Sequence, residues 1–166
     1  MKRQDMLIYE YRGDYYFIER SRQARDSEIC ASENTALTSK LPVSTDVGEI
    51  GKAVLKSLEN YDKVPPAYSP WELKELRKQL CGWVGARSYT ALVKNSRQVL
   101  VDKNYEKSKI LVIPFDNHNI DSWETMLVRR AGRLDVTASA ADVGKAVVKA
   151  FSIATYHPDR RDPDLW

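Results

Sequence analysis

The chain of 166 residues lacks the features that mark several specialised classes of protein. Seven Gly and seven Pro are too few for a collagen-like or low-complexity sequence. No apolar run approaches the roughly 18–20 residues that a membrane-spanning helix needs. The apolar residues that follow residues 1–5 end at Tyr9, which is too short for the core of a signal peptide. We therefore expect a cytoplasmic protein without a membrane partner, folded as a single domain over residues 1–166.

Cysteine and histidine are scarce. Cys30 and Cys81 lie far apart and without Cys-x-x-Cys spacing, so we expect two reduced thiols rather than a disulfide. The chain has two histidines, which leaves little for a zinc site. One loop contains three residues of the types that bind metals, although it has a single histidine: Asp116, His118 and Asp121. We expect this loop to be solvated and to hold no metal and no cofactor.

Sequence motifs of catalysis are also absent. The chain contains no Gly-rich phosphate loop, no Gly-x-Ser-x-Gly and no His-Glu-x-x-His. One enzyme hypothesis is a small metal-free ribonuclease, in which His118 and His157 form an acid–base pair and Lys109 or Arg129 stabilises a phosphorane. Both histidines lie in polar segments, where histidines without a catalytic role are far commoner. We therefore expect a protein that is not an enzyme.

Hydrophobic patterning predicts an α+β fold, in which a mixed or antiparallel sheet packs with about three helices. Residues 110–113 are apolar on both faces, so their strand should be central. Ser69, Pro70 and Glu72 form a helix start of the capping-box type, and Gly82 lies where that helix should end. The predicted strands cover residues 6–11, 15–18, 98–101, 109–114, 123–128 and 133–136. The predicted helices cover residues 46–60, 70–82 and 139–154. We expect a loop or arm over residues 20–40 and an extended tail over residues 156–166.

Two of the predicted helices repeat each other. Residues 49–58 align with residues 142–151, with five of ten pairs identical, and Asp46 and Ser139 take matching cap positions. Glycine in a helix interior costs about 1 kcal/mol relative to alanine. Gly51 and Gly144 at the same place therefore suggest that each helix presses its backbone onto a sheet and closes one half of the fold. Chance resemblance between alanine-rich helices is the alternative.

The basic excess of the chain is concentrated in residues 84–114. This stretch has six basic side chains against Asp102 and Glu106, although the net charge of the whole chain is only +3. Such a stretch can belong to strands with a solvated basic face, or to an RNA-binding module in which Tyr89 and Tyr105 stack on bases. The basic residues are Arg87, Lys94, Arg97, Lys103, Lys107 and Lys109.

The order of several short segments resembles the bacterial contact-dependent growth inhibition immunity proteins. These segments are Ala-Arg-Ser-Tyr at 86–89, Lys-Asn-Ser at 94–96, Val-Leu-Val at 99–101 and Ile-Leu-Val-Ile-Pro at 110–114. The Gly-bearing helices at 47–55 and 142–147 also match the family pattern, so the resemblance covers residues 44–153. The chain departs from this pattern at 115–123, where the family has a Gly-rich stretch and a Phe.

The resemblance implies a small cytoplasmic protein that binds the cognate toxin domain of a secreted CdiA-like protein, often a nuclease. The immunity protein would occlude the active site or substrate groove of the toxin, without catalysis and without binding nucleic acid directly. Charge complementarity would speed the association and discriminate among toxins. A loop with Trp123 and a basic turn are the expected contacts. The candidate toxin-binding residues are Asp116, His118, Asp121, Trp123, Glu124, Arg129, Arg130 and Arg133.

Overall fold

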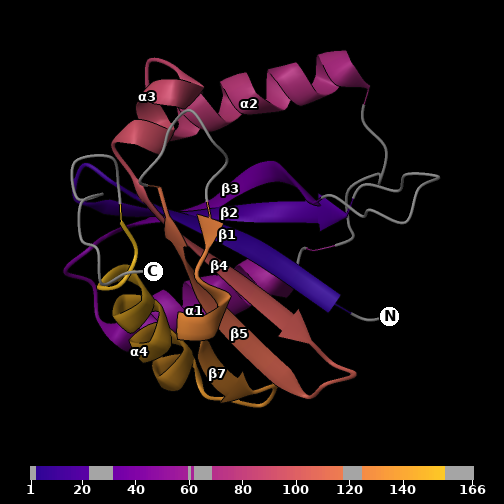
Figure 1. Ribbon diagram of the computed structural model, residues 1–166, viewed down its shortest axis with the longest axis vertical. Coiled ribbons are helices and arrows are strands. Elements are labelled where there is room, and N and C mark those ends of the chain that lie inside the picture. The colour runs from indigo at the N-terminus through magenta and orange to yellow at the C-terminus, as the bar shows by residue number, and fades with distance from the viewer. Residues whose placement is uncertain (1–2, 23–31, 60, 62–68, 118–124, 156–166) are drawn as a thin grey trace.

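The computed structural model describes residues 3–22, 32–59, 61, 69–117 and 125–155. One antiparallel sheet has the order β3-β2-β1-β4-β5, and β6 and β7 both pair with the remaining edge of β5 (Figure 1). The α+β class is thereby confirmed. The elements are β1 (Arg3–Tyr11), β2 (Asp14–Arg22), β3 (Ser32–Pro42), α1 (Val47–Glu59), α2 (Pro70–Val84), α3 (Tyr89–Lys94), β4 (Arg97–Asn104), β5 (Lys109–Asp116), β6 (Thr125–Met126), the 3₁₀ helix η1 (Val128–Arg130), β7 (Gly132–Asp135) and α4 (Ala140–Phe151).

The predicted N-terminal hairpin is confirmed, because β1 pairs with β2 from Met6↔Glu19 to Tyr11↔Asp14. Arg12 and Gly13 at its turn have φ values of 54° and 85°, a backbone combination that matches the twist of a tight hairpin. The prediction of a loop or arm over 20–40 is wrong where the structure describes it, since β2 continues to Arg22 and β3 pairs with it along its length. The strand β3 is rich in polar residues and only half-buried, and its register shifts twice, so it has no clear hydrophobic period. Residues 23–31 lie outside the described residues.

Apolar residues cover both faces of the sheet. One face, which includes Met6, Phe17, Val101 and Val112, packs against α1 and α4. The opposite face, with Leu7 and Ile18 among others, packs against α2 (Figure 1). Ile110 and Val112 face the first layer and Ile113 the second, which confirms β5 as a strand with packing on both sides.

The three predicted helices are confirmed as α1, α2 and α4, and α3 is a fourth that the sequence did not predict. At the start of α2, Ser69 N donates to Glu72 Oε2 at 2.6 Å, and Glu72 N donates to Ser69 Oγ at 3.3 Å, which is the predicted capping box. The helix ends one residue before Gly85, whose φ of 70° needs glycine, and not at Gly82. Asp46 caps α1, as predicted, by accepting a hydrogen bond from Gly48 N at 2.7 Å, and Glu49 of the first turn forms an ion pair with Lys52.

The repeated glycines pack the two helices against each other, so the prediction that each presses on the sheet is wrong. A Cβ atom at Gly51 would lie 1.7 Å from Ala140 O of α4, and one at Gly144 would lie 1.7 Å from Val47 O of α1. The helices lie side by side under the sheet as a single layer (Figure 1). The repeat therefore builds a reciprocal helix pair and not two separate halves.

The strand predicted over 123–128 is wrong for half of its described part, residues 125–128. Only Thr125 and Met126 are extended, and the chain then turns through η1. Met126 and Val128 are each 48% exposed, so apolar residues that face solvent produced a misleading strand pattern. The next strand, β7, agrees with the prediction over 133–136 to within one residue. Cys81 is a free thiol, as expected, and Cys30 lies outside the described residues. In the part of the chain that the structure describes, no helix has the length and apolar character to cross a membrane.

Candidate binding surfaces

The predicted contact residues occupy two different environments. Arg129 and Arg130 lie on η1 and Arg133 lies on β7, and all three side chains are exposed. Asp116 lies at the end of β5 and is only 2% exposed. The other predicted contacts lie outside the described residues: His118, Asp121, Trp123 and Glu124.

Asp116 belongs to a buried polar cluster and not to the described surface. Its carboxylate accepts a hydrogen bond from the Thr155 hydroxyl, and Thr155 N donates to Phe115 O at 3.1 Å. Asn117 adds to the cluster, since its backbone N–H donates to Thr155 Oγ1 at 3.2 Å and its amide Nδ2 to Ser96 O at 3.0 Å. These bonds tie the segment that follows α4 to the end of β5. The role of Asp116 in this structure is therefore to fix the fold.

Arg130 and Arg133 line a groove between the η1–β7 segment and α4, with a volume of about 430 Å³. Lys145 and Lys149 of α4 face the same groove, so four cationic side chains come together from two segments far apart in sequence. A Cβ atom at Gly132 would lie 3.6 Å from Ala146 Cβ, which shows how closely β7 approaches the helix. The floor is aliphatic: Ala131, Leu134, Ala146, Ala150 and Ile153.

The carboxylates near this groove are engaged in local hydrogen bonds. Asp142, which also lines the groove, accepts from the Ser139 hydroxyl at 2.7 Å at the start of α4. Asp135 at the end of β7 accepts from the hydroxyl and backbone N–H of Thr137 at 2.5 and 2.9 Å, and these bonds lower its pKa. Both carboxylates thus stabilise turns. The groove is basic because its four cationic side chains outnumber Asp142, the carboxylate that lines it.

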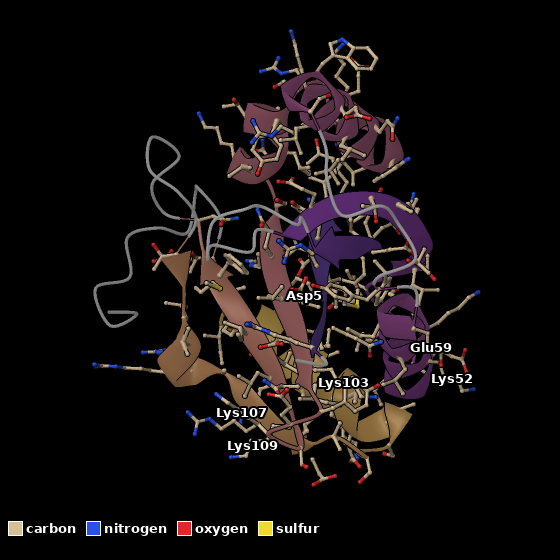
Figure 2. The ribbon with its side chains drawn as sticks, turned by 90° about the vertical axis from the view of Figure 1, so that its right-hand side faces the viewer. Asp5, Lys52, Glu59, Lys103, Lys107 and Lys109 are labelled. Atoms are coloured by element: carbon tan, nitrogen blue, oxygen red, sulfur yellow. The ribbon has the colours of Figure 1, made fainter. Side chains whose placement is uncertain are left out.

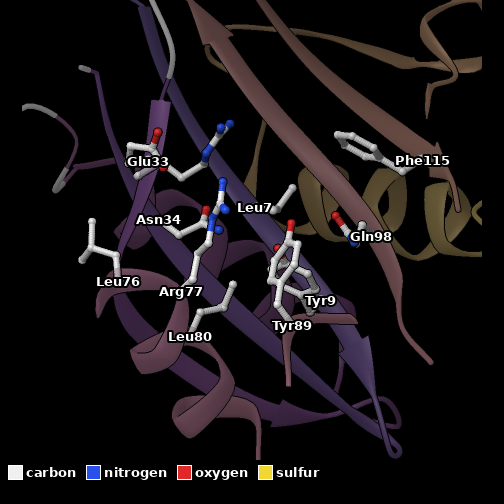
Figure 3. Close-up of a pocket in the computed structure, with 11 residues that line it drawn as sticks. Leu7, Tyr9, Glu33, Asn34, Leu76, Arg77, Leu80, Tyr89, Gln98 and Phe115 are labelled. Carbon is white, nitrogen blue, oxygen red and sulfur yellow. The ribbon is translucent and has the colours of Figure 1, made fainter. Parts of the chain in front are cut away.

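A second cavity, of about 250 Å³, lies between α2, α3 and the sheet (Figure 3). Tyr9 and Gln98 form part of its buried wall on the strand side, and Arg77 and Tyr89 approach from the helices (Figure 3). The Arg77 guanidinium lies 5.8 Å from the centre of the Tyr89 ring, at cation–π distance. Sequence reasoning missed this cavity, because two of its walls come from α3 and from β3.

The basic stretch 84–114 is divided in space. Arg87 precedes α3 and Lys94 is its last residue, while Lys103, Lys107 and Lys109 gather at the far end of the β4–β5 hairpin (Figure 2). Lys103 lies six residues after Arg97 on β4, so the strand separates the two groups by roughly 20 Å at the usual rise per residue. Arg97, between the two groups, forms an ion pair with Glu10 at 3.1 Å. The contiguous basic sequence therefore does not produce one basic face for RNA.

The described residues contain no candidate metal centre. Within them, no group of three or more His, Cys, Asp or Glu side chains is placed to hold a metal ion. Both histidines of the ribonuclease hypothesis, His118 and His157, lie outside the described residues. What the described surface offers is a basic groove and a mixed polar–aromatic cavity, both of which suit recognition of another molecule.

Comparisons with known proteins give the family. The chain matches the family model of the CDI immunity protein over residues 8–154. No curated protein sequence matches it. Two solved structures share the fold at low sequence identity. The first is a protein of unknown function from Neisseria meningitidis, with a TM-score of 0.73 and 17% identity, over 93% of this chain and 96% of that chain.

The second is a CdiA-CT/CdiI toxin and immunity complex from Yersinia pseudotuberculosis, with a TM-score of 0.70 and 14% identity, over 93% of this chain and 99% of that chain. These likenesses establish that the arrangement of helices and strands recurs in other proteins. The family match includes all of α1 to α4 and the described strands except the start of β1. The chain therefore belongs to the CDI immunity protein family.

Proposed function

We propose that this protein binds the C-terminal toxin domain of a cognate CdiA-like protein and neutralises it. The match to the CDI immunity protein family over residues 8–154 carries the proposal. The structural likeness to a CdiA-CT/CdiI toxin and immunity complex supports it, since the same fold occurs there together with a toxin.

We propose further that the toxin is a nuclease and that the immunity protein covers its active site or substrate groove. Inhibition of this kind needs a rigid complementary surface and no reactive side chain. The sheet is packed on both faces, so the groove and the cavity exist before any partner arrives. A preformed surface limits the entropy that is lost on binding. Affinity at the nanomolar level, about −12 kcal/mol, fits a protein that has to silence a nuclease in its own cell.

Co-expression tests the proposed function. The cognate CdiA toxin domain is expressed alone, with this protein, and with a non-cognate immunity protein of the same family. We expect growth arrest in the first and third cultures and growth in the second. Calorimetry of the purified pair should give a 1:1 complex. A culture that stays arrested although both proteins are present and folded contradicts the proposal.

A nuclease assay tests the proposed mechanism separately. The toxin domain is incubated with RNA and with DNA, and this protein is added in increasing amounts. We expect degradation of one substrate that stops at a 1:1 ratio, because a covered active site cannot bind nucleic acid. A stable complex that still degrades its substrate refutes occlusion and leaves the partnership intact.

A further inference from the structure

We propose that the basic groove between β7 and α4 receives an acidic segment of the toxin domain, an inference that rests on the proposed function. The groove is lined by Arg130, Arg133, Lys145 and Lys149, which extend from an edge strand, a 3₁₀ helix and the outer side of α4. Four cations around one groove attract a negatively charged partner, and they reject a partner that is positively charged.

The groove has a net positive charge, because its four cationic side chains outnumber Asp142, the carboxylate among its described lining residues. Among the described residues, no carboxylate forms an ion pair with Arg133, Lys145 or Lys149. The carboxylate of Asp142 is used at the helix start, where it accepts from Ser139 at 2.7 Å. A partner that supplies carboxylates to these three cations adds charge-assisted hydrogen bonds.

The internal repeat shows that this arrangement is particular to α4. Lys145 and Lys149 align with Lys52 and Lys56 of α1. Lys52 is paired with Glu49 at 2.7 Å, whereas the residue that aligns with Glu49 is Asp142, the carboxylate held by Ser139. Lys52 lies on the outer side of α1, as Figure 2 shows. The two aligned helices thus differ at this position, since Lys52 forms an ion pair within α1 and Lys145 forms none among the described residues.

The floor of the groove favours a protein segment over a nucleic acid. Its described lining is aliphatic, with Ala146, Ala150 and Ile153 from α4 and Leu134 from β7, and it includes no aromatic side chain. Proteins that bind single-stranded nucleic acid combine basic residues with aromatic rings on which bases stack. A segment that alternates acidic and apolar side chains satisfies both the basic rim and the aliphatic floor.

Two double variants with the same change in net charge test the inference. Lys145→Ala/Lys149→Ala removes two groove cations, and Lys52→Ala/Lys56→Ala removes the aligned lysines of α1. Binding of the cognate CdiA toxin domain is measured with full-length proteins at several salt concentrations. Circular dichroism and thermal unfolding show whether both variants remain folded.

We expect the α4 variant to bind the toxin domain about tenfold more weakly, mainly through slower association, with a reduced dependence on salt. The α1 variant should stay within about twofold of the wild type, since exposed charges away from an interface contribute little. Equal weakening of both variants overturns the inference, because it indicates a general effect of charge. Unchanged binding of the α4 variant overturns it as well and leaves the proposed function standing.

Two further outcomes separate the remaining explanations. Retention of RNA by the wild type, lost in the α4 variant while toxin binding is unchanged, overturns the inference in favour of a nucleic acid. Failure of the wild type itself to bind the toxin domain refutes the proposed function and this inference together. For a variant that does not fold, single substitutions Lys145→Gln and Lys149→Gln replace it in the same comparison.

Discussion

Gly51 and Gly144 occupy equivalent places in α1 and α4, and each is packed against the first turn of the other helix. The positions that their Cβ atoms would take are occupied by Ala140 O and Val47 O, each 1.7 Å away. The contact is reciprocal, since the residue that opposes each glycine is the first of the neighbouring helix. The repeat in the sequence is thus explained by a close contact between two helices that share one layer under the sheet.

We expect Gly51→Ala and Gly144→Ala to destabilise the protein by about 2–4 kcal/mol each, because the new methyl group must push a helix backbone away. Alanine alone would favour the helix by about 1 kcal/mol, so the packing penalty reverses the sign of the helix propensity. The measurement is the free energy of unfolding in urea. Loss of soluble protein in either variant agrees with the upper end of this range.

Gly82→Ala in α2 is the matched control. A Cβ atom at Gly82 would meet no atom of the described residues within 4 Å, although this glycine also lies inside a helix. We therefore expect a stabilisation of about 0.5–1 kcal/mol from helix propensity. If Gly51→Ala and Gly144→Ala are stabilised in the same way as Gly82→Ala, the close contact between α1 and α4 is refuted.

The capping box of α2 should make part of the stability of the protein depend on pH. The backbone hydrogen bond from Ser69 lowers the pKa of Glu72, and the Ser69 side chain lowers it by a smaller amount. A carboxylate with a lowered folded pKa contributes fully above its unfolded pKa of about 4.5, and this contribution is lost as the pH falls through the folded value. The difference in stability between wild type and Glu72→Gln should therefore shrink from pH 7 to pH 3 in urea unfolding.

Ser69→Ala tests the other half of the same cap. It removes the oxygen that accepts from Glu72 N, and we expect a loss of about 1 kcal/mol at pH 7. Ser44→Ala is the control, since Ser44 is an exposed serine outside the helices. Equal stability of the two serine variants would show that the cap contributes nothing.

Two carboxylates that face each other on neighbouring strands each form an ion pair with an arginine. Asp5 and Asp102 are direct partners in the β1–β4 register, and both are nearly buried. Arg3 binds Asp102 through two hydrogen bonds of 2.7 and 2.8 Å, which raise the pKa of Arg3, and Arg20 binds Asp5 at 3.0 Å. Each carboxylate thus has its own guanidinium.

We expect Arg3→Met to cost about 1–3 kcal/mol of stability, because it leaves Asp102 without its cation and opposite Asp5. The double variant Arg3→Met/Asp102→Asn should lose less than the sum of the two single variants, since it removes the uncompensated charge. Urea unfolding of the four proteins gives the coupling energy. Strict additivity would show that the pair does not interact.

Local signals in the sequence predicted the parts of the fold that depend on neighbouring residues. The capping box at Ser69 and Glu72, the turn at Gly13 and the apolar run 110–113 each contain their own physical cause within a few residues. The strand β3 was missed because its stability comes from pairing with β2 and packing under α2, and not from its own alternation. The helix α3 was missed because six residues are too few for a period.

The candidate site required contacts between distant segments. The sequence predicted Arg130 and Arg133 as contacts, but Lys145 and Lys149 join them only when α4 packs beside β7. The two glycines pointed to a close helix contact, yet only the structure shows that the partner is the other helix. The sequence suggested that Asp116 belongs to an exposed acidic loop. Its burial could not be predicted, because its hydrogen-bond partner Thr155 lies 39 residues away in the sequence.

The last prediction separates structure from binding at Asp116. Thr155→Val keeps the size of the side chain and removes the hydroxyl that donates to the buried Asp116 carboxylate. We expect a loss of about 1–3 kcal/mol in the free energy of unfolding, because the carboxylate stays buried without this donor. Affinity for the toxin domain, measured where the variant is fully folded, should stay within about twofold of the wild type, since both residues lie away from the described surface. Thr38→Val provides the control, because Thr38 is half-buried and its hydroxyl oxygen has no hydrogen-bond partner among the described residues, so its loss should be nearly neutral. A Thr155→Val protein of normal stability that binds the toxin domain much more weakly would make Asp116 and Thr155 part of the interface after all.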